Sequence, residues 1–278
     1  MASIPNKVTE RLAAGIKKFQ PVLIAAKNRD VNESDTVIIV TDMLSDVFGF
    51  EKYSDITSEH AVKSTYCDLA IRLEEKLQFL IEAKAIGLEL KDTFVKQAVD
   101  YAANQGVEWV VLTNGINWRI YKVIFAQPID QELVVEFDYL TLLHKNDDHL
   151  ETLYLLSKEG IRRSGLEDYH IQKQAISRFS LAATILSEPV LDVIRRELRR
   201  LSPGVKISVE EIEATLMKEV LKGEVVEGAK ADEARKRIAR VQNKASRKSK
   251  AVSESEQSAP ATSPKNEVMP LVPPTPQS

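Results

Sequence analysis

The sequence of 278 residues predicts an α/β core, a mixed central sheet flanked by helices, followed by a helical C-terminal region and a disordered tail. Three observations predict this fold class. Two short apolar runs, 67–73 and 77–84, have the length and composition of paired strands in a hairpin. Residues 91–105 lack Gly and Pro and repeat apolar residues at helical intervals. Residues 107–114 then form a continuous apolar run, typical of a strand buried on both faces.

The predicted elements follow one another along a core that we expect to span residues 31–145. A helical extension over residues 1–30 places Val8, Leu12, Ile16 and Phe19 at helical spacing. A first core helix is expected over 35–48, and a polar loop that contains His60 follows it. After the hairpin, the helix at 91–105 and the strand at 107–114, a further strand is predicted at 118–123. The order strand, strand, helix, strand predicts a right-handed crossover.

Beyond the core, strand patterns give way to helical ones over residues 146–226. Helical periodicity is found at 150–158, 166–186 and 190–201, and Ser208 with Glu211 forms a capping box for a further helix. These helices could form a small domain, mediate a homodimer, bind a partner protein or contact DNA. Arg196 and Arg200 lie one turn apart and could contact DNA phosphates, or they could form a solvated helix face.

The last segment, residues 227–278, begins with a basic run and continues as a Ser/Pro-rich stretch that we expect to be disordered. The basic run could add salt-sensitive DNA affinity although the formal net charge of the chain is −3. A solubilising linker is the alternative interpretation. The single cysteine, Cys67, excludes an intramolecular disulfide and favours a cytoplasmic location, and we expect it in the core. No signal peptide or membrane span is expected.

The register of the hairpin brings charged residues together. With a three-residue loop of Glu74, Glu75 and Lys76, Asp68 lies opposite Glu82, and opposed residues of an antiparallel pair share one face. Side chains alternate along a strand, so the face that carries Glu82 also carries Lys84. A slip of one residue would move these groups to opposite faces.

Two carboxylates at this separation favour a hard divalent cation. Asp68 and Glu82 with the carbonyl of Ala83 suit Mg²⁺, or alternatively Mn²⁺, because such ions accept a few carboxylate oxygens and keep several waters. Lys84 is expected to stabilise negative charge at the reacting phosphate rather than act as a base. A solvated charge pair at the end of a strand is the alternative.

The helix at 91–105 adds two polar residues, Gln97 and Tyr101, four positions apart and therefore on one face. We expect a helix packed over the sheet to direct them toward its open edge. A boundary glutamine and an ordinary core tyrosine are the alternative interpretation.

These residues together resemble a known family. The sequence resembles the N-terminal nuclease domain of type I restriction enzyme R subunits, which belongs to the PD-(D/E)xK, or restriction-endonuclease-like, superfamily. The residues that carry the resemblance are the segment 32–36, Asp68, the Glu82-Ala83-Lys84 triplet, Gln97 with Tyr101, and Thr113-Asn114-Gly115 followed by Trp118 and Tyr121. The resemblance covers roughly residues 30–125. It implies a restriction-endonuclease-like fold and magnesium-dependent cleavage of DNA.

The resemblance also implies residue roles. Asp68 and Glu82 match the metal-binding acids, Lys84 the catalytic lysine, and Gln97 with Tyr101 the Q-x-x-x-Y pair. A further metal-binding acid is expected from the first helix, where Glu33 is the first candidate and Asp42 the second.

The chain also departs from the family. R subunits are much longer and carry an ATP-driven translocase, whereas no G-x-x-x-x-G-K-[ST] phosphate loop is present, so a stand-alone protein without the translocase is expected. The leading functional prediction is a metal-dependent endonuclease that hydrolyses phosphodiester bonds in DNA, related to restriction or defence. The alternatives are a non-catalytic nucleic-acid-binding module on the same fold and a structural or assembly protein.

Overall fold

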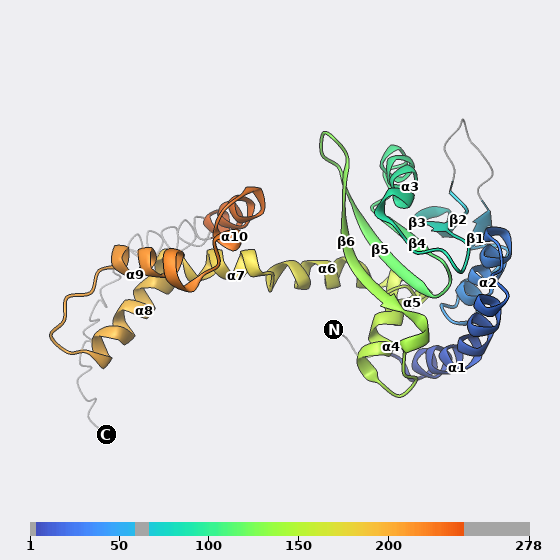
Figure 1. Cartoon of the computed structure of the whole chain (residues 1–278), viewed down its shortest axis with the longest axis horizontal. Helices are drawn as coiled ribbons and strands as arrows, with labels where there is room; N and C mark the ends of the chain where they lie inside the picture. Colours follow the sequence, from blue (N-terminus) through green and yellow to red (C-terminus); the bar gives the residue numbers. More distant parts are fainter. Residues whose placement is uncertain (1–3, 59–66, 242–278) are drawn as a thin grey trace, which may run out of the picture. The chain divides into compact units, whose positions relative to one another are not determined.

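A six-stranded sheet forms the centre of the molecule, which we describe from a computed structural model (Figure 1). The structure describes residues 4–58 and 67–241. The expectations for His60 and for the tail after residue 241 lie outside this part of the chain. The chain divides into two compact units, Met1–Gln172 and Lys173–Ser278.

The strands of the sheet follow the order of the chain, with each strand beside the next. They are β1 (Ile56–Ser58), β2 (Leu69–Leu73), β3 (Lys76–Ala83), β4 (Trp109–Thr113), β5 (Asn117–Ile124) and β6 (Asp130–Asp138). All neighbours pair antiparallel except β3 and β4, which are parallel. The predicted α/β class with a mixed sheet is confirmed. The outer strands β1 and β6 were not expected.

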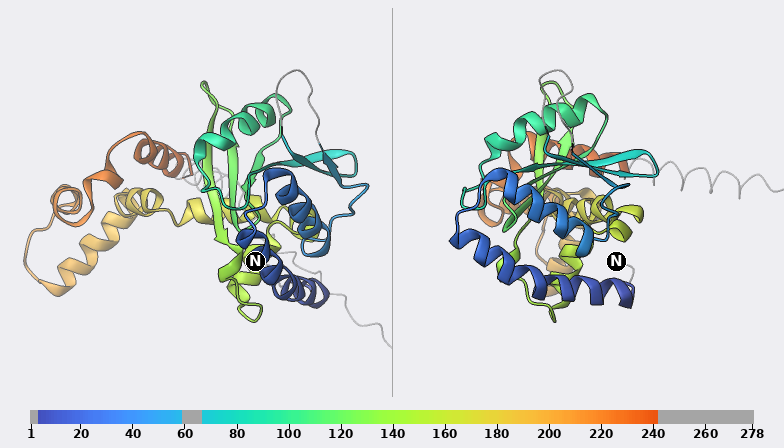
Figure 2. Two further views of the ribbon diagram at one scale, coloured as in Figure 1. Left: turned by 45° about the vertical axis from the view of Figure 1, so that its right-hand side comes forward. Right: turned by 90° about the vertical axis from the view of Figure 1, so that its right-hand side faces the viewer.

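Helices cover both faces of the sheet (Figure 2). On one face lie α1 (Asn6–Asn28) and α2 (Glu33–Asp46), whose buried side chains form a core with odd-numbered residues of β2 and β3 such as Ile71 and Ile81. On the other face lies α3 (Asp92–Asn104), which packs on even-numbered residues such as Ala70 and Leu80. The parallel pairing of β3 and β4 follows, because α3 returns the chain to the start of the next strand.

The first 30 residues belong to this unit, as do several helices that follow the sheet. Leu12 and Leu23 of α1 are fully buried, and Gln20 donates through Nε2 to the carbonyl of Tyr139 at 3.1 Å. The later elements of the unit are η1 (Tyr139–Thr141), α4 (Asp147–Tyr154), α5 (Lys158–Arg162) and the first part of α6 (Gly165–Ala175). The boundaries expected at residues 31 and 145 therefore fall inside the first unit.

The hairpin of β2 and β3 differs from the expected one in its turn. Only Glu74 and Glu75 form the loop, with φ angles of 53° and 65°, and Leu73 pairs with Lys76. The three-residue loop was wrong. A bulge then adds one residue to β3, because Arg72 pairs with Leu77 but the next pair is Ile71 with Phe79. The bulge restores the expected register for the rest of the hairpin.

The second unit consists of short helices. They are α7 (Arg178–Ile185), α8 (Glu188–Leu201), α9 (Val209–Thr215), η2 (Leu216–Val220, a π-helical segment) and α10 (Gly223–Val226), and residues 229–241 are also helical. Its small core contains Ala182, Val225 and Val226. The predicted capping box is confirmed, because the Ser208 side chain accepts from the Glu211 N–H while Glu211 accepts from the Ser208 N–H. The helix over 229–241 lies within the segment that was expected to be tail.

Candidate active site

Asp68 lies one position before β2 and faces the carboxyl end of β3. Its Oδ2 accepts a hydrogen bond from the main-chain N–H of Ala83 at 2.7 Å. The paired residues Leu69 and Ile81 lie next to it, so the same register continued by one step sets Asp68 opposite Glu82. The expected relation between the two acids is therefore present.

Glu82 and Lys84 lie at the end of β3 and contact each other. The Lys84 Nζ donates to the Glu82 Oε1 at 2.7 Å, and the two side chains are 16% and 13% exposed. The main chain of Lys84 is also fixed, because its N–H donates to the carbonyl of Thr113 at 2.8 Å and extends the pairing of β3 with β4. The lysine thus leaves the sheet from a defined point.

The two candidates for the acid from the first helix lie in different surroundings. Glu33, in the first turn of α2, places its Oε2 3.3 Å from the Nζ of Lys84. Asp42, further along α2, pairs with Lys52 at 2.8 Å. The geometry therefore favours Glu33 as the acid that joins the cluster.

The acid pair is held in a partly buried setting that opposes negative charge. Burial raises the pKa of the Asp68 carboxyl above its ordinary value, although the Ala83 N–H and the charge of Lys84 oppose the increase. Burial likewise raises the pKa of Glu82, against the hydrogen bond from Lys84, and the charge of Asp68 adds to the increase. Burial acts to lower the pKa of Lys84, but the hydrogen bond and charge of Glu82 outweigh it, so this pKa is raised.

This donor set fits a hard divalent cation of low protein coordination. Among residues 4–58 and 67–241, no group of three or more His, Cys, Asp or Glu side chains is arranged to hold a metal ion. Two carboxylates with one backbone carbonyl nevertheless suit Mg²⁺, which usually binds through one or two carboxylates and retains several waters. Burial is the main cause of the raised pKa values of Asp68 and Glu82, and the charges of neighbouring carboxylates add to the increase. The residues present are thus compatible with the expected Mg²⁺ or Mn²⁺.

A tight turn between β4 and β5 is hydrogen-bonded to the segment that follows Lys84. Asn114 is 4% exposed, and its Oδ1 accepts from the N–H groups of Ile116 at 3.1 Å and Asn117 at 2.7 Å. Its Nδ2 donates to the carbonyl of Leu88 at 2.9 Å, which fixes the segment that follows Lys84. Asn114 was not a candidate site residue. The Asn114-Gly115 pair is a turn signal that could have drawn attention to it.

Gln97 and Tyr101 both lie on α3, which covers the same face of the sheet as Ala70 and Leu80. Gln97 is exposed, and Tyr101 is half-buried beside the apolar stripe of the helix. Neither takes part in the hydrogen bonds that join Asp68, Glu82, Lys84 and Glu33. The structure therefore brings the acids and the lysine together and leaves the role of the α3 pair as a prediction.

The start of α3 is fastened to β5 by a second polar group of residues. The Tyr121 hydroxyl donates to Asp92 Oδ1 at 2.7 Å, and Arg119 donates through Nη1 to the Leu90 carbonyl at 2.9 Å. Arg119 also donates through Nε to Glu136 at 2.7 Å. These contacts fix the end of α3 that precedes Gln97.

Cys67 lies in the core, next to the acids. It is 2% exposed, and its Sγ donates to the carbonyls of Leu69 at 3.1 Å and Ile81 at 3.0 Å. Burial raises the pKa of the thiol to about 12, and the charge of Glu82 adds to the increase, so the thiol is a poor nucleophile at neutral pH. The expected core position of Cys67 is therefore observed. The residue packs in the cluster under α3 together with Ala70 and Leu80.

The candidate DNA-contacting arginines belong to the second unit. Arg200 donates through Nη1 to Glu197 at 2.9 Å, and Arg196 places its Nε 3.7 Å from the same carboxylate. Both arginine side chains are more than 60% exposed. Their charges are thus partly balanced on α8 itself, and a phosphate contact by either stays a prediction.

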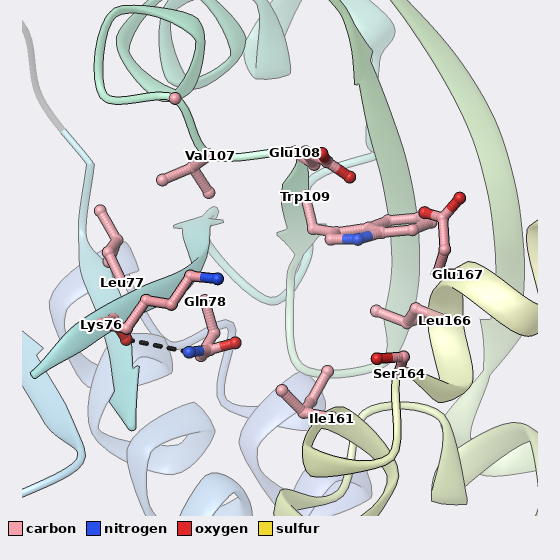
Figure 3. A pocket seen from close by; sticks show the side chains of 11 residues that line it. Lys76, Leu77, Gln78, Val107, Glu108, Trp109, Ile161, Ser164, Leu166 and Glu167 are labelled. Atoms are coloured by element: carbon pink, nitrogen blue, oxygen red, sulfur yellow. Dashed lines mark hydrogen bonds between the residues drawn. The ribbon is translucent and has the colours of Figure 1, made fainter. Parts of the chain in front are cut away.

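A cavity of about 270 Å³ opens at the other end of β3, where the strand begins (Figure 3). Its lining includes Lys76 and Gln78 of β3, Trp109 at the start of β4, and Ser164 and Glu167 from the α5–α6 region. None of the candidate site residues lines it. The acid cluster and this cavity therefore lie at opposite ends of the same strand.

Fold and cluster define an α/β domain with an acid pair and a lysine at the carboxyl end of its parallel strand β3. Residues 39–134 match the family model described as type I restriction enzyme R protein N terminus, so this stretch is similar to that domain. The match covers about a third of the chain and includes Asp68, Glu82, Lys84, Gln97 and Tyr101, whereas Glu33 precedes it. The suspected resemblance is confirmed. Neither curated proteins nor solved structures yield a match to the chain.

No helix in the described ranges 4–58 and 67–241 has the length and apolar character that crossing a membrane demands.

Proposed function

We propose that this chain is a metal-dependent endonuclease that hydrolyses phosphodiester bonds in DNA, in a restriction-related or defence-related role in the cytoplasm. One observation carries the proposal. Asp68 and Glu82 converge with Lys84 at the carboxyl end of β3, inside the stretch that matches the N terminus of type I restriction enzyme R proteins. A binding module would gain nothing from two partly buried carboxylates that repel each other.

The proposed residue roles combine the geometry of the cluster with what the family resemblance implies. Asp68, Glu82 and the carbonyl of Ala83 would hold Mg²⁺ or Mn²⁺, and Glu33, whose Oε2 lies 3.3 Å from the Lys84 Nζ, would be the further acid of the site. Such a cation, when bound, would lower the pKa of a coordinated water toward neutrality and offset charge on a phosphodiester oxygen. Lys84 would place its ammonium beside the attacked phosphate. Gln97, exposed on α3, would donate its amide to the DNA backbone, with Tyr101 beside it.

A non-catalytic DNA-binding module is the second candidate, and one observation favours it. The ammonium of Lys84 already satisfies Glu82 at 2.7 Å, so the pair is stable as a simple ion pair. In that case Arg196, Arg200 and the basic residues that follow would supply salt-dependent affinity for phosphates.

The deciding experiment incubates the purified full chain with linear and supercoiled DNA in Mg²⁺, in Mn²⁺ and in EDTA. We expect cleavage only with a divalent cation, and a loss of about 100-fold or more in Asp68→Asn, Glu82→Gln and Lys84→Ala. Asp42→Asn is the matched control, because Asp42 pairs with Lys52 instead, and it should cleave like the parent chain. Cleavage that survives all three site substitutions would refute the site. Salt-dependent DNA binding without cleavage would favour the binding module.

A further inference from the structure

Lys84 is shared between two carboxylates that differ in their surroundings. It lies 2.7 Å from Glu82, which is 13% exposed on β3, and 3.3 Å from Glu33, which is 48% exposed on α2. Lys84 itself is 16% exposed. The ammonium therefore has a closer, buried acceptor and a more distant, solvated one within reach of the same side chain.

The charges of the group do not balance without a further cation. By formal charge, Asp68, Glu82 and Glu33 contribute three negative charges and Lys84 one positive charge, which leaves two negative charges in the contacting group. One divalent cation on Asp68 and Glu82 would balance those two acids, and Lys84 with Glu33 would remain as a neutral pair. The group thus has the composition of one metal site plus one ion pair.

A metal ion bound to Glu82 would weaken the ion pair between Glu82 and the Lys84 ammonium, and the ion pair would weaken metal binding. Two positive groups on one carboxylate repel each other, and this repulsion grows as the surroundings are less polar. Glu82 is the more buried acceptor, so the competition is strongest there. Glu33 offers the ammonium an alternative, and its place in the first turn of α2 favours a negative side chain. Asn32 caps that helix by accepting from the Asp35 N–H at 2.9 Å, which fixes the start of the helix and hence the Glu33 main chain.

We propose, on the basis of the metal site proposed above, that a divalent cation displaces the Lys84 ammonium from Glu82 to Glu33. Glu33 is then a positioning residue for Lys84 and not a ligand of the metal. In the metal-loaded protein Glu33 holds the ammonium near the reacting phosphate, whereas in the metal-free protein the ammonium occupies Glu82 and keeps the acid pair from repelling.

The test measures metal affinity, which is independent of cleavage. Free Mn²⁺ is followed by electron paramagnetic resonance during titration of the full chain without DNA. Lys84→Met keeps the length of the side chain and removes its charge, so we expect Mn²⁺ to bind about tenfold more tightly, while cleavage is lost. Lys84→Gln is the second variant and should change the affinity in the same direction. Thermal unfolding of each variant confirms that it is folded.

A double-mutant cycle then separates positioning from ligation. Glu33→Gln alone should weaken Mn²⁺ binding, because the ammonium loses its alternative acceptor and stays on Glu82. In the Lys84→Met background the same substitution should change the affinity by less than about threefold, since Glu33 has no ammonium left to hold. Asp42→Asn, with its carboxylate on Lys52, should leave the affinity unchanged in both backgrounds.

Two results would overturn the inference. Unchanged affinity in both Lys84→Met and Lys84→Gln would show that the ammonium does not compete with the metal. A loss of about tenfold or more on Glu33→Gln in the Lys84→Met background would make Glu33 a ligand. If Mn²⁺ binds as expected but DNA is not cut, the proposed nuclease fails and the inference stands. If DNA is cut but the Lys84 substitutions do not change the Mn²⁺ affinity, the nuclease stands and the inference about Lys84 fails. A parent chain that binds no Mn²⁺ refutes both the proposed nuclease and the inference.

Discussion

The main-chain N–H of Ala83 donates to the Asp68 carboxylate at 2.7 Å, just beyond the last paired residues of the β2–β3 hairpin. A side chain here takes over from the backbone ladder, because the chain before Leu69 leaves the sheet. The hydrogen bond satisfies a donor on Ala83, which is fully buried, and it holds Asp68 opposite Glu82. One contact therefore serves both the fold and the candidate site.

Two substitutions of Asp68 should separate its structural from its chemical contribution. Asp68→Ala leaves the buried N–H of Ala83 without its acceptor, so we expect a loss of about 1–3 kcal/mol in the free energy of unfolding. Asp68→Asn keeps an oxygen acceptor and removes the charge that burial disfavours, so its stability should lie within about 0.5 kcal/mol of the parent or above it. Both variants should lose metal binding. Urea unfolding at pH 7 in EDTA measures the difference.

Equal destabilisation by Asp68→Ala and Asp68→Asn would contradict this assignment, because it would mean that the charge and not the acceptor matters. Glu82→Gln provides the comparison, since Glu82 accepts from Lys84 and not from the backbone.

The partly buried ion pair of Asp55 and Lys158 should make stability fall in acid. Burial acts to raise the pKa of Asp55, but the hydrogen bonds from Lys158 and the Glu51 N–H outweigh it, so the pKa lies below its ordinary value of 3.8. A carboxyl with a lowered pKa in the folded state stabilises the fold above its unfolded pKa. That contribution is lost as the pH falls below 3.8 toward the folded value.

We therefore expect Asp55→Asn to lower the free energy of unfolding at pH 7 by about 2–4 kcal/mol, because Lys158 would keep its charge in a nearly buried position. The difference between Asp55→Asn and the parent should shrink as the pH falls below 3.8. Denaturant unfolding from pH 7 to 3 measures it. Asp42→Asn is the control, because the Asp42 side chain is 47% exposed, and its effect on stability at pH 7 should be small. A difference that grows in acid would contradict the assignment.

Asn114 should affect the candidate site without touching it. Asn114→Asp keeps the acceptor for the Ile116 and Asn117 N–H groups but loses the donor to the Leu88 carbonyl, and it buries a charge. We expect a loss of about 1–3 kcal/mol in stability and faster amide hydrogen exchange at residues 85–90. DNA cleavage should fall because the segment after Lys84 loosens. Hydrogen exchange confined to other parts of the chain would argue against this coupling.

The fold class could be predicted from the sequence because the strongest elements carry unambiguous patterns. The apolar run that ends at Thr113 is typical of a buried strand. The spacing of Val95, Ala98, Val99 and Ala102 is typical of an amphipathic helix. β1 has only three residues, and β6 alternates imperfectly, so neither has a clear periodicity. β6 still contains Leu133-Val134-Val135, an apolar run that could have indicated a strand.

The candidate site was predictable in part, because its residues are close in sequence. Asp68, Glu82 and Lys84 lie on one hairpin, where alternation alone decides which side chains meet. The choice between Glu33 and Asp42 was not predictable, because it depends on where the start of α2 lies relative to β3. Asn114 was missed for the same reason, since its partner Leu88 lies in another loop.

The turn between β2 and β3 has two residues and not the three expected, although Asp68 still lies opposite Glu82 as predicted. Glu74 and Glu75 both adopt positive φ, which costs a residue with a side chain about 1–2 kcal/mol of backbone strain. Two-residue turns of this kind favour Asn followed by Gly. Replacing Glu74 with Asn and Glu75 with Gly should therefore stabilise the protein, with an increase of the order of 1 kcal/mol in the free energy of unfolding measured in urea. Glu75→Val is the matched control, because a β-branched side chain is most strained at positive φ, and it should destabilise the protein.

Cleavage and Mn²⁺ affinity should not change in the stabilised Asn-Gly variant, because the bulge between the turn and Asp68 sets the register of the acid pair independently of the turn residues. Loss of Mn²⁺ binding in a stably folded Asn-Gly variant would show that the turn, and not the bulge, aligns Asp68 with Glu82.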